Sequence, residues 1–337
     1  MDQEIKPIIF ADKKEFSKNL RVWSEHDIYD AQSRELREIM YSHPADNGNW
    51  IYFPWSGRLV HMVDNEAYTA LRTNRNRNLI TLEEQKKLGD ACVGIVGLSV
   101  GSNVATTLSY GGIANTMKLA EFDTLETTNL NRIRARIDQI GIKKIDIVAQ
   151  QIYEINPYAN LSLFSKGITE DILQSFVTSN PKPRVIFEII DSFEMKIHLR
   201  VLARIHRIPV VMITNLGDRA LIDVERYDLD PSTKFFNGRA GTVPDDILAS
   251  PDVSSEDKHR YAVALAGVEH IPQRALDSVK EIGHTLVGRP QLGSTVTLSA
   301  ALCSHVARKI ILGEDLPSCS WLVDLENIFH DDRTKIS

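Results

Sequence analysis

The chain has 337 residues, of which 43% are hydrophobic and 25% charged, and its 39 Lys and Arg against 45 Asp and Glu give a net charge of −6. This composition is typical of a soluble globular protein, and the mild negative charge gives no strong nucleic-acid signal. The three cysteines include no C-x-x-C pair, which excludes a four-cysteine zinc site and favours a reducing, cytoplasmic location. The polar N-terminus and the lack of a long uncharged apolar run predict neither a signal peptide nor a membrane span.

The first 71 residues are predicted to form an N-terminal accessory region of mixed α and β structure. Residues 13–41 are polar and helix-prone, whereas 50–54 and 58–62 are typical of a hairpin around Ser56-Gly57. No pattern in this region indicates chemistry, so we expect a small accessory or dimerisation layer.

From residue 81 onward, strand-like and helix-like segments alternate. Strands are predicted at 91–97, 116–123, 161–164, 184–190 and 208–213, and helices at 81–88, 102–110, 144–155, 168–176, 194–206 and 293–312. Such alternation forms right-handed βαβ units, so we expect a mostly parallel sheet with helices on both faces. Residues 220–226 are expected as an exposed strand, and 229–290 as an irregular, polar crossover region.

Two strand ends carry residues that indicate nucleotide binding. Gly97-Leu98-Ser99-Val100-Gly101-Ser102 joins the first strand to a helix, where glycine permits close backbone approach and the free N–H groups of the helix suit a phosphate. The second strand ends in Glu121-Phe122-Asp123, and an acidic residue about 20 residues after a glycine turn is placed to bind ribose hydroxyls. Up to this point, the pattern also fits a redox enzyme that binds NAD or FAD.

The motifs that follow narrow this choice. Asn129-Leu130-Asn131-Arg132, Gly141-Ile142-Lys143-Lys144 and Ile155-Asn156-Pro157 occur in this order, and Asp191 ends a later strand. The other matching segments are 76–88 upstream and 290–294 downstream. Together they resemble the ThiF/MoeB superfamily, the adenylating enzymes that include ubiquitin-activating enzymes.

The resemblance implies an α/β fold: a Rossmann-like, doubly wound, mostly parallel sheet of the ThiF/MoeB type over 72–314, with a small N-terminal α+β extension and a C-terminal tail at 315–337. It also implies ATP and Mg²⁺ as cofactors and a homodimer as the working unit. The implied activity is ATP-dependent adenylation of a carboxylate, with release of pyrophosphate. The carboxylate would be the C-terminus of a ubiquitin-like or sulfur-carrier protein, or a small-molecule or tRNA-borne acid.

Carried over position by position, the resemblance assigns roles to single residues. Arg132 would neutralise phosphate charge, Lys144 would bind phosphate, and Asp191 would hold Mg²⁺. Arg77, with Arg75 as its rival, would reach the nucleotide of the partner subunit. The remaining nucleotide-binding residues would be Gly97, Ser99, Gly101, Ser102, Glu121, Asp123 and Asn129, with Glu121 on the ribose.

The chain departs from the family pattern in its glycine loop and its cysteines. The loop is shorter and poorer in glycine than the usual G-x-G-G-x-G. Without cysteine pairs no zinc is expected, and 229–290 contains no cysteine to accept the acyl group. Cys92 and Cys303 are expected as buried hydrophobic residues, and Cys319 as an unreactive one near the tail. The adenylate should therefore pass directly to another molecule.

Other polar residues give weaker signals. His198, His206 and His305 lie at helical positions without metal-ligand spacing and are expected to be ordinary surface or core residues. The weaker candidates for holding a substrate carboxylate are Arg219, Arg239 and Arg289. Two alternative functions stay open: an NAD- or FAD-binding oxidoreductase, and a catalytically lapsed ThiF-fold binding protein.

Overall fold

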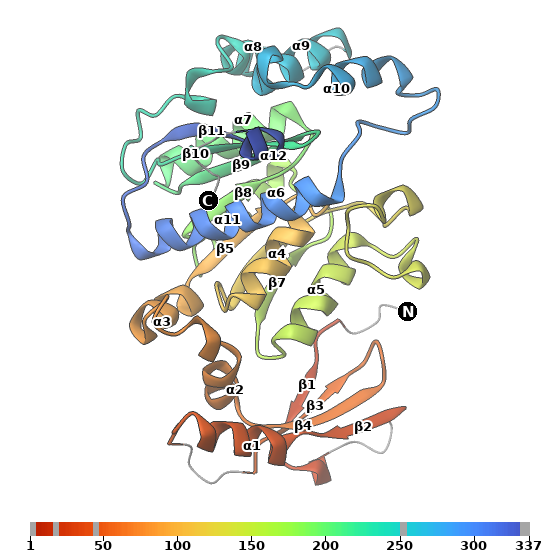
Figure 1. The fold of residues 1–337 in the computed structure, drawn as a ribbon, viewed down its shortest axis with the longest axis vertical. Helices are drawn as coiled ribbons and strands as arrows, with labels where there is room; N and C mark the ends of the chain where they lie inside the picture. Colours follow the sequence, from red (N-terminus) through yellow and green to blue (C-terminus); the bar gives the residue numbers. More distant parts are fainter. Residues whose placement is uncertain (1–4, 16–19, 43–46, 250–254, 331–337) are drawn as a thin grey trace.

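The computed structural model describes residues 5–15, 20–42, 47–249 and 255–330, and it contains two separate β-sheets (Figure 1). A four-stranded sheet lies at one end of the molecule, and a seven-stranded sheet with its helices occupies the middle. Short helices from the 229–290 segment cover the opposite end. The predicted α/β body is therefore placed between two smaller layers.

The N-terminal region forms the smaller sheet. Its elements are β1 (Ile8–Phe10), β2 (Ser24–Asp27), α1 (Tyr29–Glu38), β3 (Asn49–Phe53), β4 (Arg58–Met62) and α2 (Asn65–Arg72). The antiparallel pairing of β3 and β4 confirms the predicted hairpin. Within the helix-prone stretch 13–41, the described residues form one α-helix, α1. Residues 16–19 and 43–46 lie outside the description. β2 pairs with β4 at the sheet edge with mostly exposed side chains, so it lacks the apolar alternation that marks a strand.

The main sheet has the order β11-β10-β9-β8-β5-β6-β7. Its strands are β5 (Cys92–Val96), β6 (Thr116–Ala120), β7 (Asn160–Phe164), β8 (Val185–Glu188), β9 (Val210–Leu216), β10 (Arg219–Glu225) and β11 (Cys319–Asp324). The strands from β9 to β7 run parallel, which confirms the mostly parallel sheet, and β10 and β11 are antiparallel. β11 lies within the segment expected as a tail, yet it pairs with β10 along its length. β11 was not predicted, because its sequence is short and weakly apolar and its partner strand is distant in the sequence.

Helices cover both faces of this sheet. They are α3 (Leu82–Asp90), α4 (Val100–Tyr110), α5 (Lys144–Ile155), α6 (Glu170–Thr178), α7 (Phe193–Ile205) and α11 (Gly293–Leu312). A further helix, α12 (Leu325–His330), follows β11 and has no buried residues. Phe187 of β8 packs in a core with α3, α4, α5 and α11, whereas the adjacent Ile186 packs with α6 and α7. Because neighbouring side chains of a strand point to opposite faces, the two helix groups lie on opposite sides of the sheet.

Among the described residues, α11 is the one helix that is long and apolar enough to cross a membrane, judged by length and composition. Half of its most apolar stretch is buried inside the protein. Val296, Ala300, Cys303, Ala307 and Ile310 recur at helical spacing and pack in the core with α4 and the sheet. Burial in the fold therefore accounts for this apolar face.

The crossover region differs from the irregular segment that the sequence analysis expects. It contains α8 (Val243–Ala249), α9 (Ser255–Ala266) and α10 (Gln273–Ser278). Apolar residues of this helical cap, among them Phe236 and Leu265, pack against Ile197 of α7 and Met212 of β9. Each short helix contributes only a few apolar side chains, so no single stretch shows a clear amphipathic period.

A network of buried ion pairs joins β8, β10 and α7 near this cap. The guanidinium of Arg200, which is fully buried, donates to Glu188 at 2.7 Å and to Glu225 at 2.8 Å. Glu188 also accepts from Lys196 at 2.6 Å, and the hydroxyl of Tyr227 donates to Glu225 at 2.7 Å. Burial opposes the ionisation of Glu188, but the two cations together hold its pKa below the usual value.

Replacing Arg200 with Met should strongly destabilise the fold, because Glu188 and Glu225 would lose the buried cation that they share. Removing one partner of a buried ion pair costs about 3–5 kcal/mol, and we expect the free energy of unfolding to fall by this amount in chemical denaturation at neutral pH. The matched control is Arg274→Met on the exposed surface of α10, which should change it by less than about 0.5 kcal/mol. Equal effects of the two substitutions would contradict the prediction.

Candidate nucleotide-binding site

The turn between β5 and α4 has a shape that requires glycine at its first position. Gly97 has a φ of +87°, and a Cβ there would lie 2.2 Å from the carbonyl oxygen of Ile189. Ser99 precedes α4, its side chain makes no capping bond, and Ser102 Oγ donates to its carbonyl at 2.7 Å. The first N–H groups of a helix have no partners within the helix, so α4 presents donors at the carboxyl edge of the sheet. Gly101 lies in this same first turn.

Glu121 holds the glycine turn against the end of β6. Its carboxylate accepts hydrogen bonds from the backbone N–H groups of Leu98 at 2.8 Å, Phe122 at 2.8 Å and Asp123 at 3.0 Å. The residue is only 6% exposed. Both oxygens are thus engaged with the backbone, a positioning role that sequence reasoning missed, and the contact with ribose stays a prediction.

Asp123 and Lys144 come from separate motifs and meet in the structure. Lys144 begins α5, and its Nζ lies 2.9 Å from Asp123 Oδ2. The backbone N–H of Lys144 also donates to the carbonyl of Asp123 at 2.9 Å. The lysine side chain is 8% exposed and the aspartate 49%, so the cation is held in place while one side of the carboxylate faces solvent.

The loop that carries Arg132 is bonded to the start of α4. Arg132 Nε lies 3.4 Å from Ser99 Oγ, and the Arg132 carbonyl accepts from Asn103 Nδ2 at 3.0 Å. Asn129 caps the preceding turn, with its Oδ1 accepting from the N–H of Glu126 at 3.1 Å. Burial lowers the pKa of Arg132, and the nearby carboxylates of Asp191 and Glu126 oppose that shift. Asn103 is a second positioning residue that sequence reasoning missed, because one Asn within a helix gives no distinct signal.

Asp191 follows β8 at the same edge of the sheet. Its side chain is 93% exposed, and Oδ1 lies 2.8 Å from Nη2 of Arg289, which is itself 60% exposed. An ion pair this open to water contributes little to stability, so a ligand can displace it at low cost. The fold thus places Arg289 next to Asp191, the predicted metal ligand. Arg289 is one of the weaker predicted candidates for binding a substrate carboxylate.

Arg75 and Arg77 do not lie near this site in their own chain. Both are exposed, and Asn76 between them donates to the carbonyl of Gly111, at the C-terminal end of α4. The predicted phosphate donors lie at the other end of that helix, which has 11 residues and a length of about 16 Å. Their predicted action on the nucleotide of a partner subunit therefore requires a second chain.

The other predicted candidates have structural partners or are buried. Arg219 pairs with Asp324 at 2.7 Å, and Arg239 pairs with Asp223 at 2.6 Å, so both charges are already balanced. The expected burial of two cysteines is confirmed: burial raises the pKa of the Cys92 thiol to about 11, and it also raises the pKa of Cys303. Cys319 is partly exposed.

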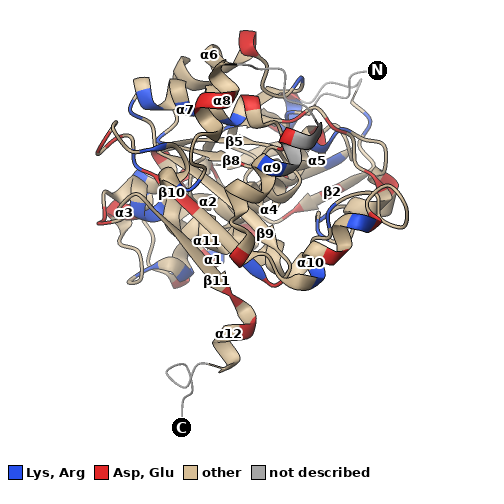
Figure 2. Ribbon diagram, turned by 90° about the horizontal axis from the view of Figure 1, so that it is seen from above, with Lys and Arg blue, Asp and Glu red and all other residues tan. Residues whose placement is uncertain are grey.

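The contacts connect one anion-binding group to the next along the sheet edge. The α4 N-terminus, Arg132 and Lys144 supply positive charge, while Asp123 and Asp191 supply the carboxylate oxygens that Mg²⁺ prefers. This donor set fits a nucleotide phosphate with a magnesium ion. Seen from the side of the helical cap, Lys and Arg are interspersed with Asp and Glu over the molecule (Figure 2).

Comparison with known proteins identifies the family. The model of the ThiF family matches residues 73–328, which is most of the chain. The chain belongs to the ThiF family. The match confirms the resemblance found in the motifs, and it extends past the predicted boundary at 314 to include β11.

The chain covers different shares of the proteins to which it is similar. An uncharacterized protein, MT1398, of Mycobacterium tuberculosis is 36% identical over 82% of this chain and 38% of its own length. Ubiquitin-like modifier-activating enzyme 5 of Arabidopsis thaliana is 34% identical over 35% of this chain and 26% of its own length. The chain thus spans well under half of either relative. The crystal structure of E. coli tRNA N6-threonylcarbamoyladenosine dehydratase has a TM-score of 0.50 at 19% identity, over 72% of this chain and 95% of that one, and shows the shared fold.

Substituting Glu121 with Gln should loosen the glycine turn, because an amide NH₂ group cannot accept the backbone hydrogen bonds that the second carboxylate oxygen accepts. A buried donor left without a partner costs about 1–3 kcal/mol, so the free energy of unfolding should fall by about that amount in urea denaturation. Glu83→Gln, in an exposed ion pair with Lys87, is the control and should have little effect. Wild-type stability in Glu121→Gln would show that the turn does not depend on this carboxylate.

Proposed function

We propose that this chain activates a carboxylate with ATP, forming an acyl-adenylate and releasing pyrophosphate. The observation that carries the proposal is the contact of Arg132 with Ser99 at the start of α4, beside the Lys144–Asp123 pair. Membership of the ThiF family, and relatives named for activating ubiquitin-like modifiers, support adenylation at a general level. An oxidoreductase would leave these paired cations unexplained.

The site residues suit the charges of this reaction. A carboxylate oxygen forms a bond to the α-phosphorus of ATP, and the bond to pyrophosphate breaks, with the electron pair leaving on pyrophosphate. Both reactants are anions, so fixed cations stabilise the transition state. Lys144 would contact the phosphates, and Arg132 can hold two phosphate oxygens at once. Asp191 would hold a Mg²⁺ ion, which would supply further charge neutralisation on the phosphates.

The substrate that we propose is the C-terminal carboxylate of a ubiquitin-like or sulfur-carrier protein, or a small-molecule or tRNA-borne acid. The names of the plant relative and of the E. coli dehydratase support the first and last of these classes. Because Cys92 and Cys303 are buried and 229–290 contains no cysteine, we propose that the adenylate passes directly to a nucleophile on another molecule. We further propose that the protein works as a cytoplasmic homodimer.

The proposal predicts ATP–pyrophosphate exchange that depends on an acid and on both cations. The acids to test are ubiquitin-like proteins with free C-termini, amino acids, and tRNA carrying threonylcarbamoyladenosine. Removal of one preorganised group that stabilises transition-state charge costs about 10²–10³-fold in rate, so Arg132→Ala and Lys144→Ala should each lose this much exchange. Lys86→Ala, in an exposed pair with Asp90, should leave exchange unchanged.

The outcomes of this experiment separate the candidate functions. ATP binding without exchange for any acid would favour the lapsed ThiF-fold binding protein. Binding of NADH in place of ATP would favour the oxidoreductase. Exchange that is indifferent to Arg132→Ala would reject the site assignment while keeping the reaction.

The position of Arg77 predicts that two chains share one site. Arg77→Ala and Lys144→Ala homodimers should both be inactive, whereas subunit exchange between them creates dimers with one intact site. For random pairing in a two-fold dimer, the mixture should recover about a quarter of the wild-type exchange rate. A mixture without recovery would contradict action across the dimer, and the same mixing with Arg75→Ala tests the rival arginine.

A further inference from the structure

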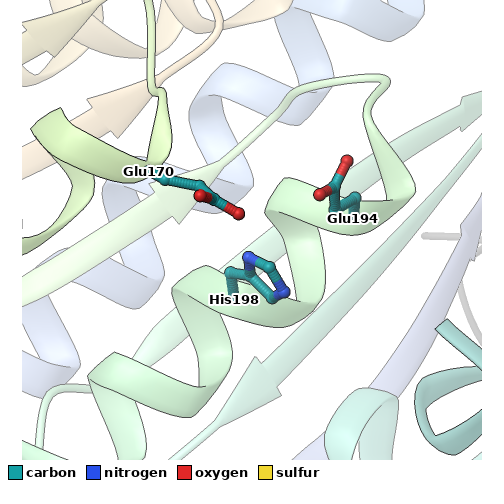
Figure 3. Close-up of side chains that lie close together, drawn as sticks. All are labelled: Glu170, Glu194 and His198. Atoms are coloured by element: carbon teal, nitrogen blue, oxygen red, sulfur yellow. The ribbon is translucent and has the colours of Figure 1, made fainter. Parts of the chain in front are cut away.

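We propose that Glu170, Glu194 and His198 form a binding site for one divalent transition-metal ion, on the α6–α7 side of the sheet. One ligand atom from each residue lies within 4.8 Å of the other two. Figure 3 shows the three side chains converging from two helices, with Glu170 on α6 and the other two on α7. The three residues are distinct from those of the candidate nucleotide site, and the inference does not depend on the proposed function.

The fold brings these side chains together by two separate means. Glu194 and His198 are four residues apart on α7, so they lie on one face of that helix, one turn apart. Glu170 is the first residue of α6, which packs beside α7 through a core that includes Phe176 and Leu199. The convergence is therefore fixed by rigid helices, which suits a site that must keep its geometry.

The charges of the cluster are uncompensated in the described part of the chain. Neither Glu170 nor Glu194 has a Lys or Arg partner within ion-pair distance there. The nearest cations along α7 are used elsewhere: Lys196 donates to Glu188, and Arg200 donates to Glu188 and Glu225. Two carboxylates and an imidazole thus face one another without a cation.

A simpler explanation covers only part of this arrangement. Glu170 and Glu194 stand in the first turns of their helices, where a carboxylate is stabilised by the helix dipole. That effect acts on each helix alone. It does not account for the convergence of the two carboxylates from separate helices, or for His198 between them.

The donor set indicates the class of metal. Imidazole suits Zn²⁺ and other first-row transition metals, whereas Mg²⁺ and Ca²⁺ prefer sites made of oxygen alone. A triangle with sides of 4.8 Å has its centre about 2.8 Å from each corner, so shifts of under about 1 Å bring the ligands to the distances of about 2.0–2.2 Å that zinc requires. Water or another ligand would fill the remaining position.

This inference revises two expectations from the sequence. The lack of cysteine pairs predicts no zinc, and the lack of metal-ligand spacing among His198, His206 and His305 predicts that His198 is an ordinary residue. A carboxylate–imidazole site needs neither feature. Glu194 follows Asp191 by three residues, so a metal ion bound here would also restrain the segment that leads from Asp191 into α7.

The test is titration of the full chain, stripped with a chelator and free of nucleotide, with Zn²⁺ followed by calorimetry. We expect saturable Zn²⁺ binding to the wild-type chain, and we expect the His198→Ala variant to lose one of the sites. Mg²⁺ and Ca²⁺ should bind only weakly. Loss even of an outer-shell partner costs about 10–100-fold in metal affinity, so loss of the imidazole should weaken this site by at least about 100-fold. The control His284→Ala removes an exposed imidazole from another segment and should leave the site unchanged.

A second pair of variants keeps the test independent of misfolding. Glu170 is exposed, so Glu170→Gln should keep the wild-type circular dichroism spectrum and still lose the site, whereas Asp171→Asn, next to it in α6, should keep it. Absence of saturable Zn²⁺ binding, or Zn²⁺ binding that survives both His198→Ala and Glu170→Gln, would overturn the proposal. Because no ATP is present, neither result depends on adenylation.

Discussion

The candidate site depends on the hydrogen bonds that the buried carboxylate of Glu121 accepts from the backbone. This carboxylate accepts hydrogen bonds from Leu98 on one strand end and from Phe122 and Asp123 on the next. Three N–H donors offset much of the cost of burying this charge. They also set the direction in which α4 leaves the sheet and the position of Asp123. The positions of the proposed phosphate-binding groups depend on this one side chain, although it is nearly closed to solvent.

Buried and exposed charges have different roles in this protein. Around Arg200, the ion pairs with Glu188 and Glu225 are fully buried, and they join β8, β10 and α7. At the sheet edge, Asp191 and Arg289 are open to water, and Asp123 is half exposed. Exposed pairs exchange partners at low cost. The exposed pairs can therefore rearrange without disturbing the buried ones.

The layers at the two ends of the molecule are tied to the elements that carry the site, and the 229–290 segment also supplies Arg289 to it. The helical cap packs on α7 and β9 through Phe236 and Leu265. At the other end, Tyr68 of α2 donates to the carbonyl of Ile155 at 2.8 Å, which ties the N-terminal region to the end of α5. α5 begins at Lys144, so contacts at both ends of this helix hold the proposed phosphate-binding lysine in place.

The sequence by itself determined the parallel core of the sheet and the family. Continuous apolar strands, the cap at Thr81 and the ordered motifs from Gly97 to Asp191 are local patterns, and each is visible in a window of a few residues. Such patterns can be recognised without knowing which segment packs against them, because they follow from the strand and helix periods. The prediction of α11 from 293 to 312 agrees with the structure at both ends for this reason.

Only the tertiary structure decided what depends on contacts between distant segments. β11 pairs with β10 across about a hundred residues, and the short helices of the cap form a core only when they are packed together. In the same way, the structure placed Glu121 on the backbone, Arg289 on Asp191, and Glu170 beside His198. A side chain carries no local mark of the partner that it will meet, since the partner is chosen by packing. The sequence therefore indicated which residues are chemically able to act, and the fold decided which of them act together.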